Sequence, residues 1–231
     1  MAGWSGHSKS QGGTIARIGI IGSGRIGGNA GRLFAGAGHE VLFSFSRDRT
    51  KLEALAAEAD ARAGAPEEAA RFGEVVMLSV PWALVDEALE VAGPLECKIL
   101  IDTTNQFGRD ETGNFGVLDL PDGLSAAAFN ARRAEGARLV KAYNTMTAGF
   151  QAEAAGREGL DRVVMFYAGD YEGANRIVAG LIEDSGFDPV YVGSLTGDVV
   201  WMEPPRREGA LYGEEFHLQE AREAVAKLTG R

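Results

Sequence analysis

Cysteine, histidine and long apolar runs are all scarce in this sequence. The chain of 231 residues contains one cysteine and three histidines. A lone thiol cannot form an internal disulfide, and it offers no zinc-binding set with histidines that are scattered along the chain. No run approaches the roughly 18–20 apolar residues of a membrane-spanning helix. These absences exclude a disulfide framework, a structural zinc site and a helical membrane anchor, and they favour a cytoplasmic protein.

An excess of positive charge is also missing. The chain has 23 basic and 33 acidic residues, a formal net charge of −10. Nucleic acids and anionic membranes are bound through basic surfaces, so neither is expected as a partner. With 45% hydrophobic residues the chain can build a full core. Its expected partner is a small molecule.

Three further expectations concern the two ends of the chain and its single cysteine. Residues 1–14 are rich in Gly and Ser without an apolar centre, which predicts a flexible arm rather than a signal peptide. Cys97 precedes the apolar run 98–101 and is expected to be a buried structural thiol. A helix over 214–228 closes the chain and leaves open whether a homodimer forms.

Short apolar runs alternate with helical patterns along most of the chain. Strands are predicted at 16–22, 40–46, 75–80, 99–102, 138–143, 163–168 and 189–192. Helices are predicted at 24–37, 49–59, 66–72, 83–92, 124–135, 171–185 and 214–228. This order predicts a doubly wound α/β fold over residues 15–195, with a mainly parallel Rossmann-type sheet. Residues 196–231 are expected to form a small C-terminal helical appendage, a candidate acceptor or dimer contact. Residues 103–123 are expected to be a long functional loop.

A glycine turn leaves the first strand and opens the first helix. Gly22, Gly24 and Gly27 form the pattern G-x-G-x-x-G in that context. Gly22 suits a tight turn, Gly24 lets a pyrophosphate approach the backbone, and Gly27 lets the helix lie close to the strand. The helix N-terminus then offers N–H groups and partial positive charge to the phosphates. The pattern therefore predicts a dinucleotide-binding domain.

The second strand ends without the acid that would bind a ribose 2′-hydroxyl. In its place stand Ser46 and Arg47, with Arg49 and Lys51 shortly after. Cationic donors suit a 2′-phosphate, which a carboxylate would repel. Asp48 is one position late, and we expect it to cap the following helix. The stretch predicts NADP(H) rather than NAD(H).

The wording and order of several motifs resemble one family. IGIIGSGRIGGNAGRLFAGAGHEV, then SR with a lysine four residues after the arginine, then VVMLSVPW, IDTTN and KAYNTM follow one another along residues 16–205. This order resembles the NADP-dependent reductases of the deazaflavin coenzyme F-420. The ferric reductase domains of some eukaryotic membrane proteins are similar and use the fold with a flavin.

The resemblance implies a set of NADP-binding residues. The 2′-phosphate would be held by Ser46, Arg47 and Lys51. The pyrophosphate would be lined by Ser23, Arg25 and Ile26. Along the path from adenosine to nicotinamide would lie Ser79, Val80 and Pro81, and near the nicotinamide Asn105, Ala142, Tyr143 and Asn144. A deazaflavin would stack on the nicotinamide, with hydride passing between C4 of one ring and C5 of the other.

The chain also departs from the family pattern. Tyr143 replaces a common phenylalanine, residues 147–150 replace a small apolar run, and residues 203–207 with the last helix have no close counterpart. We expect the acceptor to be chosen in this C-terminal part.

No catalytic acid, base or metal ligand is predicted. Hydride transfer between stacked rings depends on proximity and orientation. Lys141 and Asn144 have a spacing that hydroxyacid dehydrogenases use on a helix, but here Lys141 falls in a predicted strand. Asp102 ends a strand, and we expect it to hold the turn 103–105 rather than act as a base.

Besides hydride transfer to a flavin-like redox acceptor, two functions stay open: an NADP-dependent reductase of a small carbonyl or imine, and a non-enzymatic NADP(H) sensor.

Overall fold

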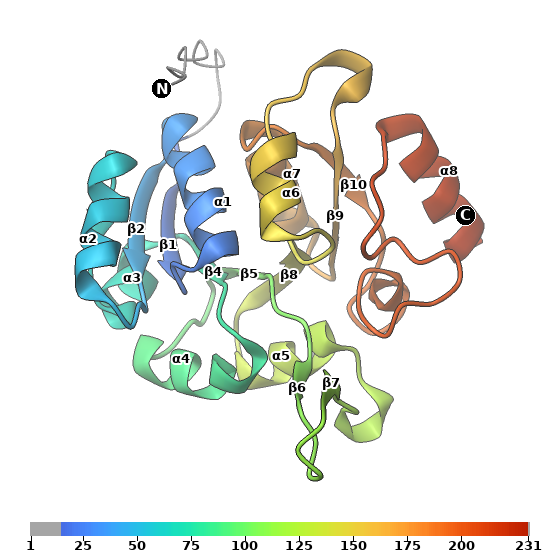
Figure 1. The fold of residues 1–231 in the computed structure, drawn as a ribbon, viewed down its shortest axis with the longest axis horizontal. Coiled ribbons are helices and arrows are strands. Elements are labelled where there is room, and N and C mark those ends of the chain that lie inside the picture. The colour runs from blue at the N-terminus through green and yellow to red at the C-terminus, as the bar shows by residue number, and fades with distance from the viewer. Residues whose placement is uncertain (1–14, 231) are drawn as a thin grey trace.

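The protein is built on one twisted sheet with helices on both faces (Figure 1). A computed structural model describes residues 15–230. The eight-stranded sheet has the order β10-β9-β8-β5-β4-β1-β2-β3. Its strands are β1 (Arg17–Ile21), β2 (Glu40–Ser44), β3 (Arg62–Ala63), β4 (Val75–Leu78), β5 (Ile99–Asp102), β8 (Arg138–Ala142), β9 (Val164–Gly169) and β10 (Asp188–Tyr191). Neighbouring strands are parallel except β8 and β9, which confirms the predicted doubly wound, mainly parallel fold.

The helices divide between the two faces of the sheet. They are α1 (Arg25–Gly36), α2 (Arg49–Glu58), α3 (Pro66–Phe72), α4 (Val85–Ala92), α5 (Ala126–Arg133), α6 (Ala148–Ala154), α7 (Glu172–Asp184) and α8 (Leu218–Thr229). Buried side chains of α1, α2, α6 and α7 share one apolar cluster, and those of α3, α4, α5 and α8 share the other. Both faces of the central strands are therefore covered, which explains why they read as continuous apolar runs.

The chain order predicts a ligand site at the carboxyl end of β1. From β1 the chain moves outward to β2 and β3, then returns to the other side of β1 as β4. At this reversal α1 and α4 follow β1 and β4 toward opposite faces, and folds of this kind bind their ligands in a crevice at such a point. The predicted glycine turn follows β1 at this point.

A buried ionic cluster holds the carboxyl ends of β5 and β8 together. Lys141 in β8 and Asp102 in β5 have no exposed surface, and Glu203 has 2% exposed. The Lys141 Nζ lies 3.0 Å from Asp102 Oδ2 and 3.4 Å from Glu203 Oε1, and it also donates to the carbonyl of Thr104. Asp102 Oδ1 accepts from the Thr104 amide at 2.9 Å. The predicted role of Asp102 in holding this turn is thus confirmed.

Glu203 also caps a helix. Its carboxylate accepts from the Ala126 and Ala127 amides, each at 2.8 Å, at the N-terminus of α5. The positive end of the helix stabilises this charge. One side chain thus joins the C-terminal segment, a helix and the sheet centre.

The rest of the C-terminal segment also packs against the body of the protein, through apolar side chains. Met202, Leu211 and Ala221 are buried in the apolar cluster that contains Leu139 of β8. The segment before α8 runs extended beside β9, where the Val164 amide donates to the Phe216 carbonyl at 2.9 Å. This pairing explains why α8 begins at Leu218 and not at residue 214 as predicted.

Two further sequence predictions differ from the structure. The predicted loop 103–123 contains a hairpin of β6 (Phe107–Arg109) and β7 (Phe115–Val117). Cys97 is exposed, so the expectation of a buried thiol was wrong. Its φ of 62° puts it in a left-handed turn before β5 begins at Ile99, so it lies outside the buried strand. No helix within residues 15–230 is long and apolar enough to cross a membrane. Residues 1–14, which are predicted to form an arm, lie outside the described part of the chain.

We expect Glu203→Ala to lower the free energy of unfolding by about 3–5 kcal/mol, because it leaves a buried lysine with one fewer counter-charge and removes the cap of α5. Chemical denaturation measures this difference. Glu74→Ala is the matched control, since Glu74 makes an exposed ion pair with Arg17 at 2.9 Å, and we expect it to change stability by less than about 1 kcal/mol. Equal losses in the two variants would contradict a central role for Glu203.

Candidate functional site

Close packing requires glycine at two positions of the turn. At the third position an added side chain would meet open space. Gly22 has a φ of +105°, and a Cβ there would lie 2.2 Å from the Ser79 carbonyl oxygen. A Cβ on Gly27 would lie 2.2 Å from the Gly22 carbonyl oxygen. Gly24 has nothing within 4 Å of an ideal Cβ. Gly22 and Gly27 are thus required for the packing of the turn. Gly24 has no such packing role, and it leaves the space beside the start of α1 open.

Gly24 is also the N-cap of α1, and it supplies no side-chain acceptor to the helix. The first turn of α1 contains no acidic residue. The N–H groups of this turn therefore keep their donor capacity and partial positive charge for an anion.

The neighbours of the glycines have different surroundings. The Ser23 hydroxyl donates to the Ser44 carbonyl at 2.8 Å and ties the turn to β2. Ile26 is half-buried and packs on the apolar cluster of α1. Arg25 is exposed, and within residues 15–230 no ion pair engages it. The guanidinium at the start of α1 can therefore reach an anion at the turn.

Three basic residues follow the end of β2, and two of them form ion pairs within residues 15–230. Lys51 lies 3.3 Å from Asp48, and Arg49 lies 2.8 Å from Glu53. Arg47 is exposed and has no ion-pair partner in the described part of the chain.

Asp48 caps α2 as predicted. Its side chain accepts from the Lys51 amide at 3.1 Å. This hydrogen bond, with that of the Lys51 side chain, lowers the pKa of Asp48. The Ser46 hydroxyl lies within the same turn and donates to the Asp48 carbonyl at 3.1 Å. The one acidic residue in the sequence stretch 43–51 is thus occupied in capping.

The residues after β4 continue the edge of the crevice. Ser79 is half-buried, and its hydroxyl accepts from the Thr103 hydroxyl at 3.1 Å. Val80 is buried, and Pro81 is exposed at the start of the following helical turn. The connection after β4 is thereby joined to the connection after β5.

An asparagine pair joins the connections after β5 and β8. The Asn144 Nδ2 group donates to Asn105 Oδ1 at 3.0 Å and to the Met202 carbonyl at 2.7 Å. Asn105 Nδ2 donates back to the Asn144 carbonyl at 3.0 Å. These bonds fix the orientation of both carboxamides.

The two residues before Asn144 offer only their main chain to this edge. Ala142 and the Tyr143 side chain are fully buried. The Tyr143 hydroxyl lies 2.8 Å from Ser185 Oγ, and its ring packs edge-on against Phe34 with centroids 5.9 Å apart. Burial raises the pKa of Tyr143, so its hydroxyl stays protonated. The tyrosine that departs from the family pattern is therefore a core residue.

Three residues that support this edge were not predicted as part of the site. Lys141 and Glu203 hold the Thr104 turn, and the Met202 carbonyl orients Asn144. A lysine inside the apolar strand RLVKA was a signal of a buried, paired charge. Glu203 and Met202 carried no local signal, because their partners lie far away in the sequence.

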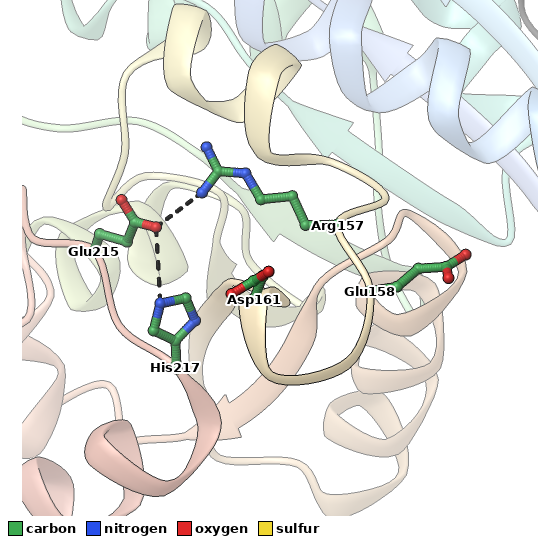
Figure 2. A pocket seen from close by; sticks show the side chains of 5 residues that line it. All are labelled: Arg157, Glu158, Asp161, Glu215 and His217. Carbon is green, nitrogen blue, oxygen red and sulfur yellow. Dashed lines mark hydrogen bonds and ion pairs between the residues drawn. The ribbon is translucent and has the colours of Figure 1, made fainter.

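A separate hollow of about 380 Å³ lies near the start of α8. Its lining is charged and consists of Arg157, Glu158, Asp161, Glu215 and His217 (Figure 2). Glu215 Oε1 lies 2.9 Å from Arg157 Nη1 and 3.9 Å from His217 Nε2. None of the predicted site residues lines it, and charged walls do not suit a planar apolar ring.

Within residues 15–230, no group of three or more His, Cys, Asp or Glu residues could hold a metal ion. What the crevice offers is open helix N–H groups, unpaired guanidinium groups and oriented carboxamides. Such donors hold and orient an anionic ligand.

We expect Gly22→Ala to destabilise the protein by about 2 kcal/mol or more, because the new Cβ meets a main-chain carbonyl at a strained φ. Gly24→Ala meets open space and should cost no more than about 1 kcal/mol, with its main loss in dinucleotide affinity. Denaturation and ligand titration of both variants measure these effects. A large stability loss in Gly24→Ala would contradict this division of roles.

Solved structures with the same architecture include bacterial and fungal proteins. A hypothetical protein of Sinorhizobium meliloti is 28% identical, with 88% of this chain and 96% of that chain covered at a TM-score of 0.75. A proposed F420-dependent NADP reductase of Arthrobacter sp. FB24 is 24% identical, covering 78% and 86% at a TM-score of 0.67. A reductive aminase of Aspergillus terreus, solved with NADPH and ethyl levulinate, is 19% identical, covering 94% and 61% at 0.58.

A comparison with curated proteins gives no match. The family model described as NADP oxidoreductase, coenzyme F420-dependent, matches residues 17–106. That range contains the glycine turn, the end of β2 and the ends of β4 and β5. The resemblance predicted from the sequence is confirmed: residues 17–106 match a family of NADP-dependent oxidoreductases, and the fold is that of Rossmann-type reductases.

Proposed function

We propose that the protein binds NADP(H) along the carboxyl ends of β1, β2, β4, β5 and β8 and transfers a hydride between it and a flavin-like acceptor. The acceptor would be deazaflavin F-420, a flavin, or ferric iron through a flavin. The observation that carries the proposal is Arg47, an exposed guanidinium without an ion-pair partner among residues 15–230, at the end of β2 where a carboxylate would select NAD(H).

The residues present fit such a dinucleotide. Open space at Gly24 and the uncapped start of α1 suit a pyrophosphate. Arg47 suits a 2′-phosphate, because Asp48 is occupied at the N-cap of α2. The family match and the NADPH complexes of the structurally similar fungal aminases support this assignment.

The protein's part in the transfer would be to bind and orient. The nicotinamide supplies a hydride donor or acceptor carbon when bound. Asn105 and Asn144 form a rigid pair at the far end of the crevice from the phosphate site, which suits the positioning of a ring. No proton transfer by the protein is required for this step, and the Tyr143 hydroxyl is buried against Ser185 in the core.

A reductase of a small carbonyl or imine is the second candidate. It is favoured by the structural similarity to reductive aminases and imine reductases. This chain spans 61% of the aminase, however, so more than a third of that protein has no counterpart in the match. A protein that only senses NADP(H) is the third candidate.

Binding selectivity gives the first test. We expect NADPH to raise the melting temperature more than NADH, because only NADPH carries the 2′-phosphate. Arg47→Ala should weaken NADPH binding by about 1.5–3 kcal/mol, the contribution of a charged hydrogen bond, and leave NADH binding unchanged. Arg17→Ala, which removes an exposed arginine paired with Glu74, is the matched control. Equal stabilisation by both dinucleotides would refute the 2′-phosphate assignment.

Turnover separates the three candidates. We expect the protein to oxidise NADPH in the presence of FMN or a 5-deazaflavin, measured as loss of absorbance at the reduced nicotinamide band. Cyclic imines and small ketones are the comparison substrates. Oxidation with imines alone would establish the second candidate, and tight NADPH binding without any turnover would establish the sensor.

A further inference from the structure

The hairpin β6–β7 presents apolar side chains on one of its faces. Phe107 pairs with Val117 across the two strands, and Arg109 pairs with Phe115. The two phenylalanine rings are nearly parallel, with an interplanar angle of 18° and centroids 6.5 Å apart. Phe115 is 69% exposed and Val117 38% exposed. These neighbouring side chains form a patch, which a scattered surface residue would not.

The opposite face of the hairpin meets Leu118 at the base of the hairpin. It carries Gly108, which pairs with Gly116. A Cβ on Gly108 would lie 2.7 Å from a methyl carbon of Leu118, and Leu118 packs against the apolar core. Because side chains alternate along a strand, the phenylalanine face points away from that contact.

Hydrogen bonds hold the hairpin stiff at both ends. At the tip, Asp110 Oδ1 accepts from the Thr112 hydroxyl at 2.6 Å and from the Thr112 and Asn114 amides, each at 2.9 Å. At the base, the Leu118 amide donates to the Gln106 carbonyl at 2.8 Å, and Gln106 Nε2 donates to the Pro204 carbonyl at 2.8 Å. The aromatic face is therefore presented by an ordered arm that projects from the body (Figure 1).

This arm is continuous with the asparagine pair. Phe107 follows Asn105 by two residues, and its amide donates to the Asn105 carbonyl at 2.7 Å. Strand β6 also contacts the helical turn Trp82–Leu84, directly after Pro81. The exposed aromatic face thus begins where the nicotinamide end of the proposed dinucleotide site ends.

We propose that Phe107 and Phe115 form the platform on which the planar ring of the hydride acceptor docks. The inference rests on the proposed function. A flavin-type ring is planar and largely apolar, and it packs favourably on phenylalanine rings. Residues 202, 203 and 211 of the C-terminal segment are buried, and the hollow of Figure 2 is lined by polar and charged side chains, so neither presents an exposed apolar face to such a ring.

The test measures ring binding separately from turnover. FMN and 5-deazariboflavin are titrated by equilibrium dialysis against wild type, Phe107→Ala and Phe115→Ala, all saturated with NADP⁺. We expect the affinity for both probes to fall about threefold to tenfold in each variant, the contribution of an aromatic contact. NADPH affinity and melting temperature should stay unchanged. Leu160→Ala, which truncates a side chain that is 94% exposed in another segment, should bind both probes like wild type.

Each other outcome has a distinct meaning. Equal probe affinity in Phe115→Ala and wild type, or no probe binding to wild type, overturns the platform. A loss of self-association on sedimentation with unchanged probe affinity also overturns it and identifies the face as a contact between two copies. If wild type binds the probes but oxidises no NADPH with any acceptor, the proposed function fails, and the effect of the two variants on probe affinity still decides the platform.

Discussion

The buried ion cluster of Lys141, Asp102 and Glu203 is the interaction on which the carboxyl edge of the sheet depends. Three charges inside a core are unfavourable unless each is paired and hydrogen-bonded. Here the surplus negative charge is met by the N-terminus of α5 and by the Asn130 carboxamide, which donates to Asp102 Oδ2 at 3.1 Å. The cluster is complete only when β5, β8, α5 and the C-terminal segment are all in place. It therefore couples the position of the Asn105 turn to the folding of the whole chain.

The two ends of the proposed dinucleotide site are built by different means. At the phosphate end, Gly22, Gly24 and Gly27 act through local sterics within one strand–turn–helix unit. At the nicotinamide end, Asn105 and Asn144 are held by each other and by Met202, residues from three distant segments. A local motif can be reused in any such fold, whereas a long-range arrangement belongs to one chain. This difference explains why the cofactor end of the site is easier to assign than the acceptor end.

Sequence patterns located the strands and most helices because burial on both faces and helical spacing leave a local signature. They also placed Asp48 at a helix cap and Asp102 at a turn, since both contacts lie within three residues. The patterns misplaced Cys97, because an apolar run does not reveal the left-handed turn before it. They missed the hairpin in residues 103–123, because a strand of three residues is too short to show alternation.

The sequence by itself determined the doubly wound sheet, the glycine turn and the cationic end of β2, because each depends on neighbouring residues and on backbone geometry. Only the tertiary structure decided that Arg49 and Lys51 form ion pairs while Arg47 has no ion-pair partner among the described residues, since that depends on which carboxylates lie within reach. The tertiary structure also decided that Tyr143 is buried in the core and that Glu203 belongs to the buried ion cluster with Lys141. Those contacts join residues dozens of positions apart, and only the folded chain brings them together.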